Sequence, residues 1–321
     1  MDHRDFLKSF FTEHWKYMTV STACKLNLFE ALESGRKTSL EIAQNLVVAQ
    51  QHIELLLEGL VSIKFLDKEK SSYALNDISV FLTENHPETL KYACLNWSGD
   101  HLQAWMALDE SLKTGKSFFQ NNYDEDYFEF LNRDKEKLNQ YHKAMFAYAE
   151  DDYQNLTDKI DFSKHKSIMD VGGGYGAAIS QIKENFPQLE CYLFDLPSVI
   201  ESCNLQNDVF LRAGDFFDEI PKVSDCIILS RILHDWNDEK ASEVLKNTYD
   251  ALPGKGQLYV IENCSDKITT DLSLLSLNML AMCESFERSS YEYIAMARES
   301  GFIFQDAISL NELQTILTFT K

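Results

Sequence analysis

Proline, basic residues and long apolar runs are all scarce in this sequence. Only 5 prolines and 12 glycines occur in 321 residues, and 45% of the residues are apolar, which excludes a disordered chain. Lys and Arg total 30 against 51 Asp and Glu, a formal charge of −21. Such a surface repels nucleic acid, so we expect no nucleic-acid partner. No run approaches the roughly 18 apolar residues that cross a membrane, so we expect no membrane association.

Disulfide and metal motifs are missing as well. The seven cysteines are odd in number and form no CxxC pair or Cys/His cluster, which argues against a disulfide framework and against a metal site. The first residues, MDHRDFLKSFFTEHW, include acidic side chains and contain no apolar signal-peptide core. We therefore expect a cytoplasmic protein without a bound metal.

A chain of this length exceeds one ordinary hydrophobic core, which predicts more than one domain. Within residues 1–100 the pattern predicts a helix over 15–35, a second helix begun by a Thr38–Glu41 capping box, a third over 51–66, and a hairpin over 65–77. Three helices and a hairpin are typical of a winged helix. The third helix is acidic and apolar, so we expect it to pack in a domain or dimer core rather than on DNA.

The rest of the chain changes character twice. Residues 101–155 are helical and rich in aromatic side chains, and we interpret them as a connector that lines the substrate pocket. Over 156–321 short β-branched runs alternate with helical stretches, which predicts a parallel sheet covered by helices. The expected fold class is α/β, a C-terminal Rossmann-like domain preceded by a mainly helical winged-helix domain.

The segment SIMDVGGGYGAAISQI combines a buried strand, a glycine-rich turn and the start of a helix. Gly172, Gly174 and Gly176 alternate, so the backbone can turn sharply and a ligand can approach it closely. Asp195 ends the next strand, nineteen residues after Gly176, where a carboxylate can accept hydrogen bonds from ribose hydroxyls. This order predicts an adenosine-containing cofactor, but it does not distinguish NAD from S-adenosylmethionine.

Residues further along the chain favour S-adenosylmethionine. Gly214 is followed directly by Asp215 and Phe216. A carboxylate beside an aromatic ring suits an adenine, because the carboxylate accepts from the exocyclic amine while the ring packs on the adenine face. A dinucleotide enzyme would not need this pair.

Five segments in order extend this interpretation: DVGGGYG, FDLPSVI, GDFF, LHDWNDEKASEVLKNTYDALPGKGQLYVIE and NMLAMCESFERS. Together they resemble the class I S-adenosylmethionine-dependent O-methyltransferases of the caffeic acid, hydroxyindole and bacterial polyketide type, over nearly the whole chain. The resemblance implies a homodimer formed through the N-terminal domain. It also implies methyl transfer to a small aromatic hydroxylated substrate, as in secondary metabolism.

The resemblance further implies the site residues. His234 of the LHDW motif corresponds to the general base of the family, and Glu262 and Glu287 flank it. The expected cofactor-binding residues are Gly172, Gly174, Asp195, Leu196, Gly214, Asp215, Phe216, Ser230 and Arg231. Ser230 stands where plant members have a lysine, so a hydroxyl or a backbone group replaces that contact here. The expected substrate-binding residues are Asp235, Asn278, Met279 and Met282.

The chemistry of methyl transfer agrees with these residues. A phenol with a pKa near 10 is ionised in only about one molecule in a thousand at neutral pH. A histidine can remove that proton, worth roughly 10²–10⁴-fold in rate, and a carboxylate on its other ring nitrogen fixes its tautomer. Two alternatives stay open. The bound sulfonium can serve only as a charge, assisting hydroxylation, decarboxylation or cyclisation, or the chain can be a cofactor-binding regulator without turnover.

Overall fold

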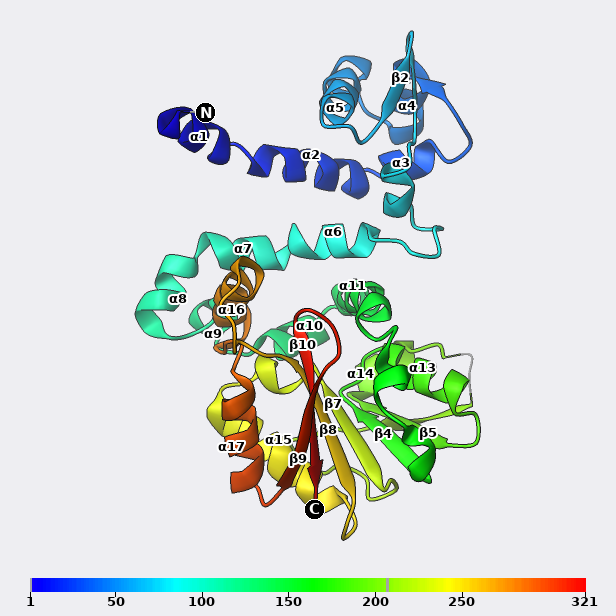
Figure 1. The fold of residues 1–321 in the computed structure, drawn as a ribbon. Coiled ribbons are helices and arrows are strands. Elements are labelled where there is room, and N and C mark those ends of the chain that lie inside the picture. The colour runs from blue at the N-terminus through cyan, green and yellow to red at the C-terminus, as the bar shows by residue number, and fades with distance from the viewer. Residues whose placement is uncertain (1, 206–207) are drawn as a thin grey trace. The chain divides into compact units, whose positions relative to one another are not determined.

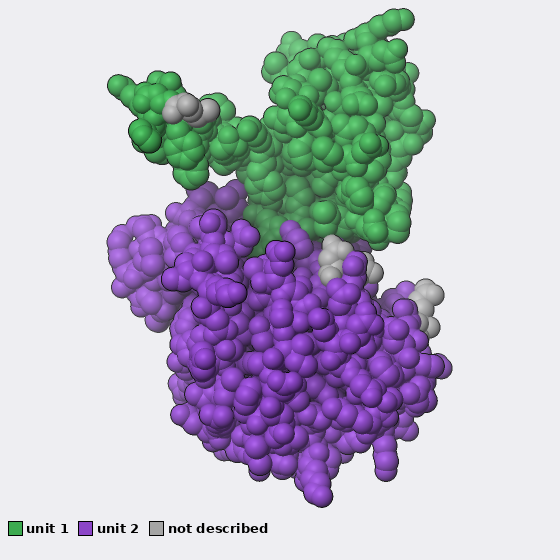
Figure 2. Space-filling view, in the orientation of Figure 1, with its two compact units in different colours: residues 1–100 green, residues 101–321 purple. Residues whose placement is uncertain are grey.

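The structure is a computed structural model that describes residues 2–205 and 208–321, apart from the side chains of residues 150 and 151. The chain divides into two compact units, Met1–Asp100 and His101–Lys321, which Figure 2 colours separately. Residues 101–155 group with the unit that contains the large sheet. The three-part division into residues 1–100, 101–155 and 156–321 stays a prediction.

The first unit is mainly helical. Its helices are α1 (His3–Phe10), α2 (His14–Lys25), α3 (Leu28–Ala31), α4 (Ser39–Leu46), α5 (Gln50–Ser62), η1 (Ser79–Leu82) and α6 (Lys91–Trp97). The single helix predicted over 15–35 is wrong, because the chain breaks between α2 and α3 at Asn27, whose φ is 55°. Asparagine visits the left-handed region more readily than most residues, so it can turn the chain well before Gly35.

A small antiparallel sheet completes this unit. Its strands β1 (Lys37–Thr38), β2 (Asp67–Glu69) and β3 (Ser72–Ala74) lie in the order β1-β3-β2, which confirms the predicted hairpin. The capping box is also confirmed, since the Thr38 side chain accepts from Glu41 N and the Glu41 side chain accepts from Thr38 N. The core of the unit gathers buried residues from α2 to α5, including Leu28, Phe29, Ile42, Ile53 and Leu57.

The second unit begins with a run of helices. These are α7 (Asp100–Met106), α8 (Leu108–Thr114), α9 (Phe118–Tyr123), α10 (Tyr127–Asn132), α11 (Lys135–Asp152), α12 (Leu156–Lys159) and η2 (Phe162–Lys164). Further along come α13 (Ala177–Asn185), α14 (Pro197–Ser202), η3 (Leu233–Asp235), α15 (Asp238–Ala251), α16 (Thr270–Cys283) and α17 (Ser290–Glu299). In the described part of the chain, no helix is both long and apolar enough to cross a membrane.

A seven-stranded sheet forms the centre of the second unit (Figure 1). Its strands are β4 (Ser167–Val171), β5 (Glu190–Asp195), β6 (Val209–Ala213), β7 (Cys226–Ser230), β8 (Gln257–Asn263), β9 (Ile303–Ser309) and β10 (Gln314–Thr320). The order is β6-β5-β4-β7-β8-β10-β9, with β10 antiparallel to both neighbours and the other pairs parallel. The predicted parallel sheet is confirmed, whereas β6, β9 and β10 were not anticipated.

Side chains alternate along each strand, and helices cover both faces of the sheet at its centre, so β4 and β7 are buried on both faces. Met169 and Val171 of β4 join the core beneath α15 and α17, while Ile168 joins the core beneath α12 and α13. β5 lies on one side of β4 and β7 lies on the other, so the direction in which strands are added to the sheet reverses at β4. Ligands of such sheets bind at the carboxyl ends of the strands near this switch in strand order.

Candidate active site

The glycine-rich loop between β4 and α13 requires glycine. Gly172, Gly174 and Gly176 have positive φ angles of 72°, 59° and 78°, which are costly for residues with a Cβ. A Cβ on Gly172 would lie 2.5 Å from the Ile232 side chain and 3.5 Å from the Phe216 ring. A side chain at Gly172 would therefore have to displace these neighbours.

Asp195, at the end of β5, ties this loop to the next strand. Its carboxylate accepts hydrogen bonds from Gly174 N and from Leu196 N, each at 2.7 Å. Burial raises the pKa of Asp195 to about 6, and the two backbone hydrogen bonds oppose that increase. Each carboxylate oxygen accepts one of these bonds and keeps a lone pair for another donor. This spare acceptor capacity beside the glycine loop fits the ribose hydroxyls of an adenosyl group.

The Gly214–Phe216 turn lies next to Asp195. Gly214 N donates to the Asp195 backbone oxygen at 3.0 Å, so the turn continues the pairing of β5 with β6. Asp215 is held by the backbone of Phe217, whose N–H donates to Asp215 Oδ1 at 2.8 Å. The structure thus brings the predicted adenosine-binding residues together at the carboxyl ends of β4, β5 and β6.

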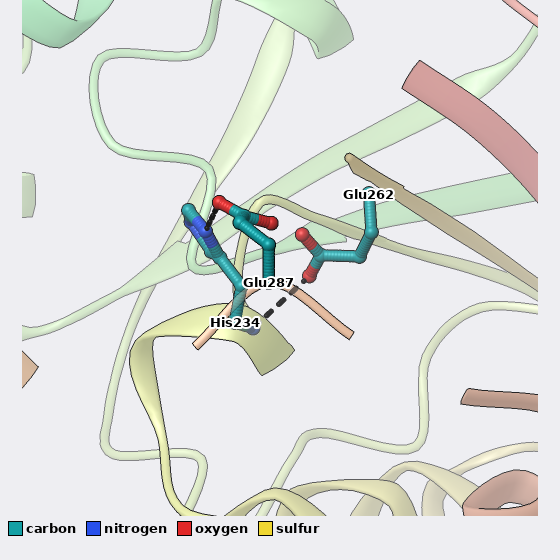
Figure 3. A group of neighbouring side chains, drawn as sticks. All are labelled: His234, Glu262 and Glu287. Carbon is teal, nitrogen blue, oxygen red and sulfur yellow. Dashed lines mark hydrogen bonds and ion pairs between the residues drawn. The ribbon is translucent and has the colours of Figure 1, made fainter. Parts of the chain in front are cut away.

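His234, Glu262 and Glu287 come together from η3, β8 and the loop before α17 (Figure 3). His234 Nδ1 lies 2.8 Å from Glu287 Oε1. One nitrogen or oxygen atom from each of the three side chains lies within 4.8 Å of the others, and all three residues are buried. The structure therefore assembles the histidine and both carboxylates that the sequence singled out.

Glu262 contacts the backbone around His234. Its Oε1 accepts hydrogen bonds from three consecutive amides, at 3.0, 2.8 and 3.4 Å: those of Ile232, Leu233 and His234. In the described residues its Oε2 has no hydrogen-bond partner. Glu262 therefore holds the start of η3 and sets the direction of the His234 side chain, whereas Glu287 holds the imidazole ring.

Arg288 also binds the backbone of this segment, a role that the sequence did not predict. Its Nη1 donates to Leu233 O at 2.9 Å and its Nη2 donates to Trp236 O at 2.8 Å. The residue is 1% exposed and also pairs with Asp238 at 2.7 Å. The only signal in the sequence is that Arg288 follows Glu287 in the FERS motif.

Charges around His234 favour its protonated form in the ligand-free protein. Burial by itself lowers the pKa of His234, but the charge of Glu287, with smaller contributions from Asp235 and Glu262, raises it to about 9. Arg231 opposes this increase. The converse holds for Glu287, since the His234 charge and hydrogen bond lower its pKa although burial acts in the other direction.

Ser230, which ends β7, and Arg231, which follows it, have partners that the sequence did not reveal. The Ser230 hydroxyl shares a hydrogen bond with the Tyr153 hydroxyl, which lies 77 residues earlier in the chain. Arg231 has a positive φ of 57°, and its Nε lies 3.4 Å from His234 Nε2. Both side chains were expected to bind the cofactor, and they lie between the glycine loop and the histidine along the edge of the sheet.

A cavity of about 120 Å³ lies beside Asp235, and its lining mixes three aromatic residues with polar and charged ones such as Asp126, Lys240 and Glu284. Asp235 lines the cavity, and its Oδ1 lies 3.6 Å from His234 Nε2. Phe128 and Trp236 also line it, with ring centroids 5.6 Å apart and planes inclined by 35°. Aromatic faces next to polar side chains suit a small aromatic ring that carries polar groups.

The remaining predicted substrate residues lie on α16. Asn278 Oδ1 accepts a hydrogen bond from Trp105 Nε1 at 2.8 Å. Met279 and Met282 are 4% and 1% exposed, and Met282 packs with Phe119 in an apolar cluster. Asn278 and Met282 therefore connect α16 to α7 and α9, and Met279 is buried.

Comparison with known proteins identifies the family. Residues 105–303 match the model of the O-methyltransferase domain, and residues 9–85 match the O-methyltransferase dimerisation domain. The chain belongs to the O-methyltransferase family. The resemblance noted in the sequence is thereby confirmed, and with it S-adenosylmethionine as the methyl donor.

Several relatives share this methyltransferase architecture along most of their length. Acetylserotonin O-methyltransferase of Gallus gallus is 30% identical over 301 residues, 88% of this chain and 87% of the relative. Isoflavone 4'-O-methyltransferase of Glycyrrhiza echinata is 31% identical over 74% of this chain and 68% of its own. Phenazine O-methyltransferase of Lysobacter antibioticus is 25% identical over 92% of this chain and 89% of the relative. The crystal structure named LaPhzM superposes with a TM-score of 0.95 at 23% identity and covers 100% of this chain and 99% of its own, which confirms the fold.

Proposed function

We propose that this methyltransferase transfers a methyl group from S-adenosylmethionine to a hydroxyl of a small phenolic or polyketide-like aromatic, with His234 as general base. The buried His234–Glu287 pair carries the proposal. Because Glu287 binds Nδ1, the nitrogen that can take a proton is Nε2, which lies 3.4 Å from Arg231 Nε and 3.6 Å from Asp235 Oδ1, and Asp235 lines the cavity. A base in this position can take the acceptor proton as the methyl group moves.

The two glutamates that contact His234 have separate tasks. Glu287 fixes the Nδ1–H tautomer and supports the imidazolium that forms when Nε2 takes a proton. Glu262 holds the backbone amides that position the ring. The sulfonium of the bound donor supplies the methyl group. The neutral form of His234 is the reactive one, so we expect kcat/KM to rise with pH through an apparent pKa above the ordinary histidine value.

The cofactor-binding roles follow the carboxyl edge of the sheet. Asp195 accepts from the ribose hydroxyls, with Leu196 next to it and the bare backbone of Gly172 and Gly174 alongside. Beyond Gly214, Asp215 accepts from the adenine amine while the Phe216 ring packs on the adenine face. Ser230 and Arg231 complete the set nearest the reacting centre.

The acceptor site lies among the aromatic walls near Asp235. Met282 packs in one apolar cluster with Tyr127 and Phe128, and we assign Asn278 and Met279 of the same helix to the acceptor site as well. The relatives are named for phenazine, acetylserotonin and isoflavone acceptors, all of which contain aromatic rings. These names support the proposed substrate class.

The proposal includes a homodimer formed through the first unit. The match to the dimerisation domain over residues 9–85 supports it. A row of large apolar side chains on and after α1 also supports it, because such exposure is costly in water unless a partner covers it: Phe10 at 61%, Phe11 at 65% and Trp15 at 62% exposed.

Incubation with isotopically labelled methyl donor and a panel of phenols, catechols, hydroxyindoles and aromatic polyketides tests the function. Methyl transfer adds the mass of one methylene and the label to the product. Consumption of an acceptor without label would instead identify hydroxylation, decarboxylation or cyclisation. Binding of the donor with no change in any acceptor would contradict an enzymatic role for this panel's substrate class.

A further inference from the structure

The Tyr153 hydroxyl is buried in the second unit and shares a hydrogen bond with the Ser230 hydroxyl. Tyr153 directly follows α11, and its N–H donates to Ala149 O at 3.1 Å, so the end of the helix holds its backbone. The residue is 5% exposed and belongs to the same apolar cluster as Ala177 and Ala178, which begin α13 after the glycine-rich loop. From this core, Tyr153 brings a phenol hydroxyl to the end of β7.

Two hydroxyls that share one hydrogen bond have one hydrogen left over, because each brings one O–H. An ordinary tyrosine has a pKa of about 10, far below that of an aliphatic alcohol, so the phenol of Tyr153 is the better donor and Ser230 Oγ the better acceptor. Burial raises the pKa of Tyr153, so the phenol keeps its proton. The Ser230 hydroxyl makes no other hydrogen bond to the residues that the structure describes. Its own hydrogen therefore remains for a ligand.

The end of β7 lies between the adenosine-binding strands and the base. The strand order is β6-β5-β4-β7, and the residues assigned above to adenosine follow β5 and β6. His234 comes four residues after Ser230. Because the methyl group must reach a hydroxyl beside His234, the donor extends along the carboxyl ends of the strands from β6 toward β7. The methionine part of the donor, which carries the sulfonium, therefore comes to the end of β7.

The donors at the end of β7 determine which methionine group binds there. Arg231 follows Ser230 directly, and its guanidinium and the Tyr153 phenol are close enough for each to affect the pKa of the other. A hydroxyl hydrogen and a cation at one place suit an anion that accepts from both. In methionine that anion is the α-carboxylate.

We infer that Tyr153 is a positioning residue for the methyl donor, which holds the Ser230 hydroxyl in the orientation that donates to the methionine carboxylate. This role rests on the cofactor-binding roles of Ser230 and Arg231 in the proposed function. Tyr153 lies 77 residues before Ser230 and outside every motif of the cofactor site. Without the phenol, the Ser230 hydroxyl rotates freely and must be ordered when the donor binds, which lowers affinity.

Calorimetry with two ligands tests this role: S-adenosylhomocysteine and its decarboxylated form, S-adenosyl-3-thiopropylamine, which keeps the adenosine and the amine. Tyr153→Phe removes only the hydroxyl. We expect this variant to bind S-adenosylhomocysteine at least about fivefold more weakly, and the decarboxylated ligand with less than about twofold change. An equal loss for both ligands would show a merely structural role and overturn the inference, as would native affinity for both.

Tyr259→Phe is the matched control. Tyr259 belongs to the same apolar cluster as Tyr153, is 2% exposed, and its hydroxyl lies 3.5 Å from His165 Nε2. We expect native affinity for both ligands in this variant. A loss confined to S-adenosylhomocysteine here as well would mean that the carboxylate responds to any hydroxyl of this core, which contradicts a specific role of Tyr153.

A double substitution tests whether Tyr153 acts through Ser230. Ser230→Ala should by itself weaken binding of S-adenosylhomocysteine at least about fivefold. Addition of Tyr153→Phe to Ser230→Ala should then change the affinity by less than about twofold, because the hydroxyl that Tyr153 positions is already absent. Losses that multiply in the double variant would show that the two hydroxyls act independently and would overturn the positioning role.

Turnover separates this role from the proposed function, because the binding measurements need no reaction. In Tyr153→Phe we expect KM for the methyl donor to rise at least about fivefold, with a nearly native kcat and a native KM for the acceptor. A native KM for the donor would refute the positioning role and leave the function standing. A carboxylate preference that depends on Tyr153, without methylation of any phenol, would refute the proposed function and leave the positioning role standing.

Discussion

Glu287 Oε1 lies 2.8 Å from His234 Nδ1, and both residues are buried, at 3% and 4% exposed. A buried carboxylate and imidazole at this distance form one acid–base unit in which each partner changes the pKa of the other. Nε2 of His234 stays outside this pair and lies 3.4 Å from Arg231 Nε.

Removal of the base should slow turnover without affecting the cofactor site. His234→Asn keeps a polar side chain of similar size but cannot take a proton at neutral pH. We expect kcat to fall by at least about 10²-fold, with the affinity for S-adenosylhomocysteine unchanged by calorimetry. His52→Asn, at an exposed position in the first unit, serves as the control and should behave like the native protein. A nearly native kcat in His234→Asn would show that proximity of the reactants suffices.

The pH dependence should identify Glu287 as the main charge acting on His234. The pKa of His234 is raised to about 9, so its protonation stabilises the native state fully below the ordinary histidine value near 6.5. This stabilisation is lost as the pH rises through about 9, while the neutral base and therefore kcat/KM increase.

In Glu287→Gln the loss of stability and the rise of kcat/KM should both occur at lower pH, because the carboxylate charge no longer favours the imidazolium. Profiles of kcat/KM and of the denaturation midpoint against pH test this. Glu299→Gln, an exposed position at the end of α17, is the matched control. Identical profiles for Glu287→Gln and the control would mean that Asp235 and Glu262 alone raise the pKa.

Asp195 should control cofactor affinity. Asp195→Asn keeps one acceptor oxygen for the loop amides but replaces the other by a donor that cannot accept from ribose. We expect S-adenosylhomocysteine to bind at least about tenfold more weakly, as measured by calorimetry. Asp250→Asn, on the exposed side of α15, should bind it with native affinity. Native affinity in both variants would remove the ribose assignment.

Val47 should be a site at which the first unit can be stabilised. It caps α4 with a φ of 56° and is 91% exposed, so a β-branched side chain occupies a strained conformation without packing in return. Val47→Gly removes that strain, and we expect about 1 kcal/mol more protection of the α4 amides in hydrogen exchange. Leu40→Gly, at an exposed helical position in α4, should lower protection by a similar amount. A loss of protection in Val47→Gly would contradict the strain argument.

Local chemistry made several features predictable from the sequence. The Thr38–Glu41 capping box and the turn at Gly172, Gly174 and Gly176 depend on backbone conformations within a few residues, which residue type largely determines. The parallel sheet followed from short apolar runs between helices. The helix break at Asn27 was missed because the apolar pattern continues through it and only one residue changes conformation.

The sequence by itself was enough to predict the family, the glycine-rich loop and His234 as the candidate base, because each depends on a short motif and the motifs occur in a fixed order. Only the tertiary structure decided how the motifs act on one another. Glu262 and Glu287 lie 28 and 53 residues from His234, and nothing local indicates that one binds the backbone and the other the ring. The contact of Arg231 Nε with His234 Nε2 was not predictable either. The direction of a side chain depends on the packing of strands that come from distant parts of the chain.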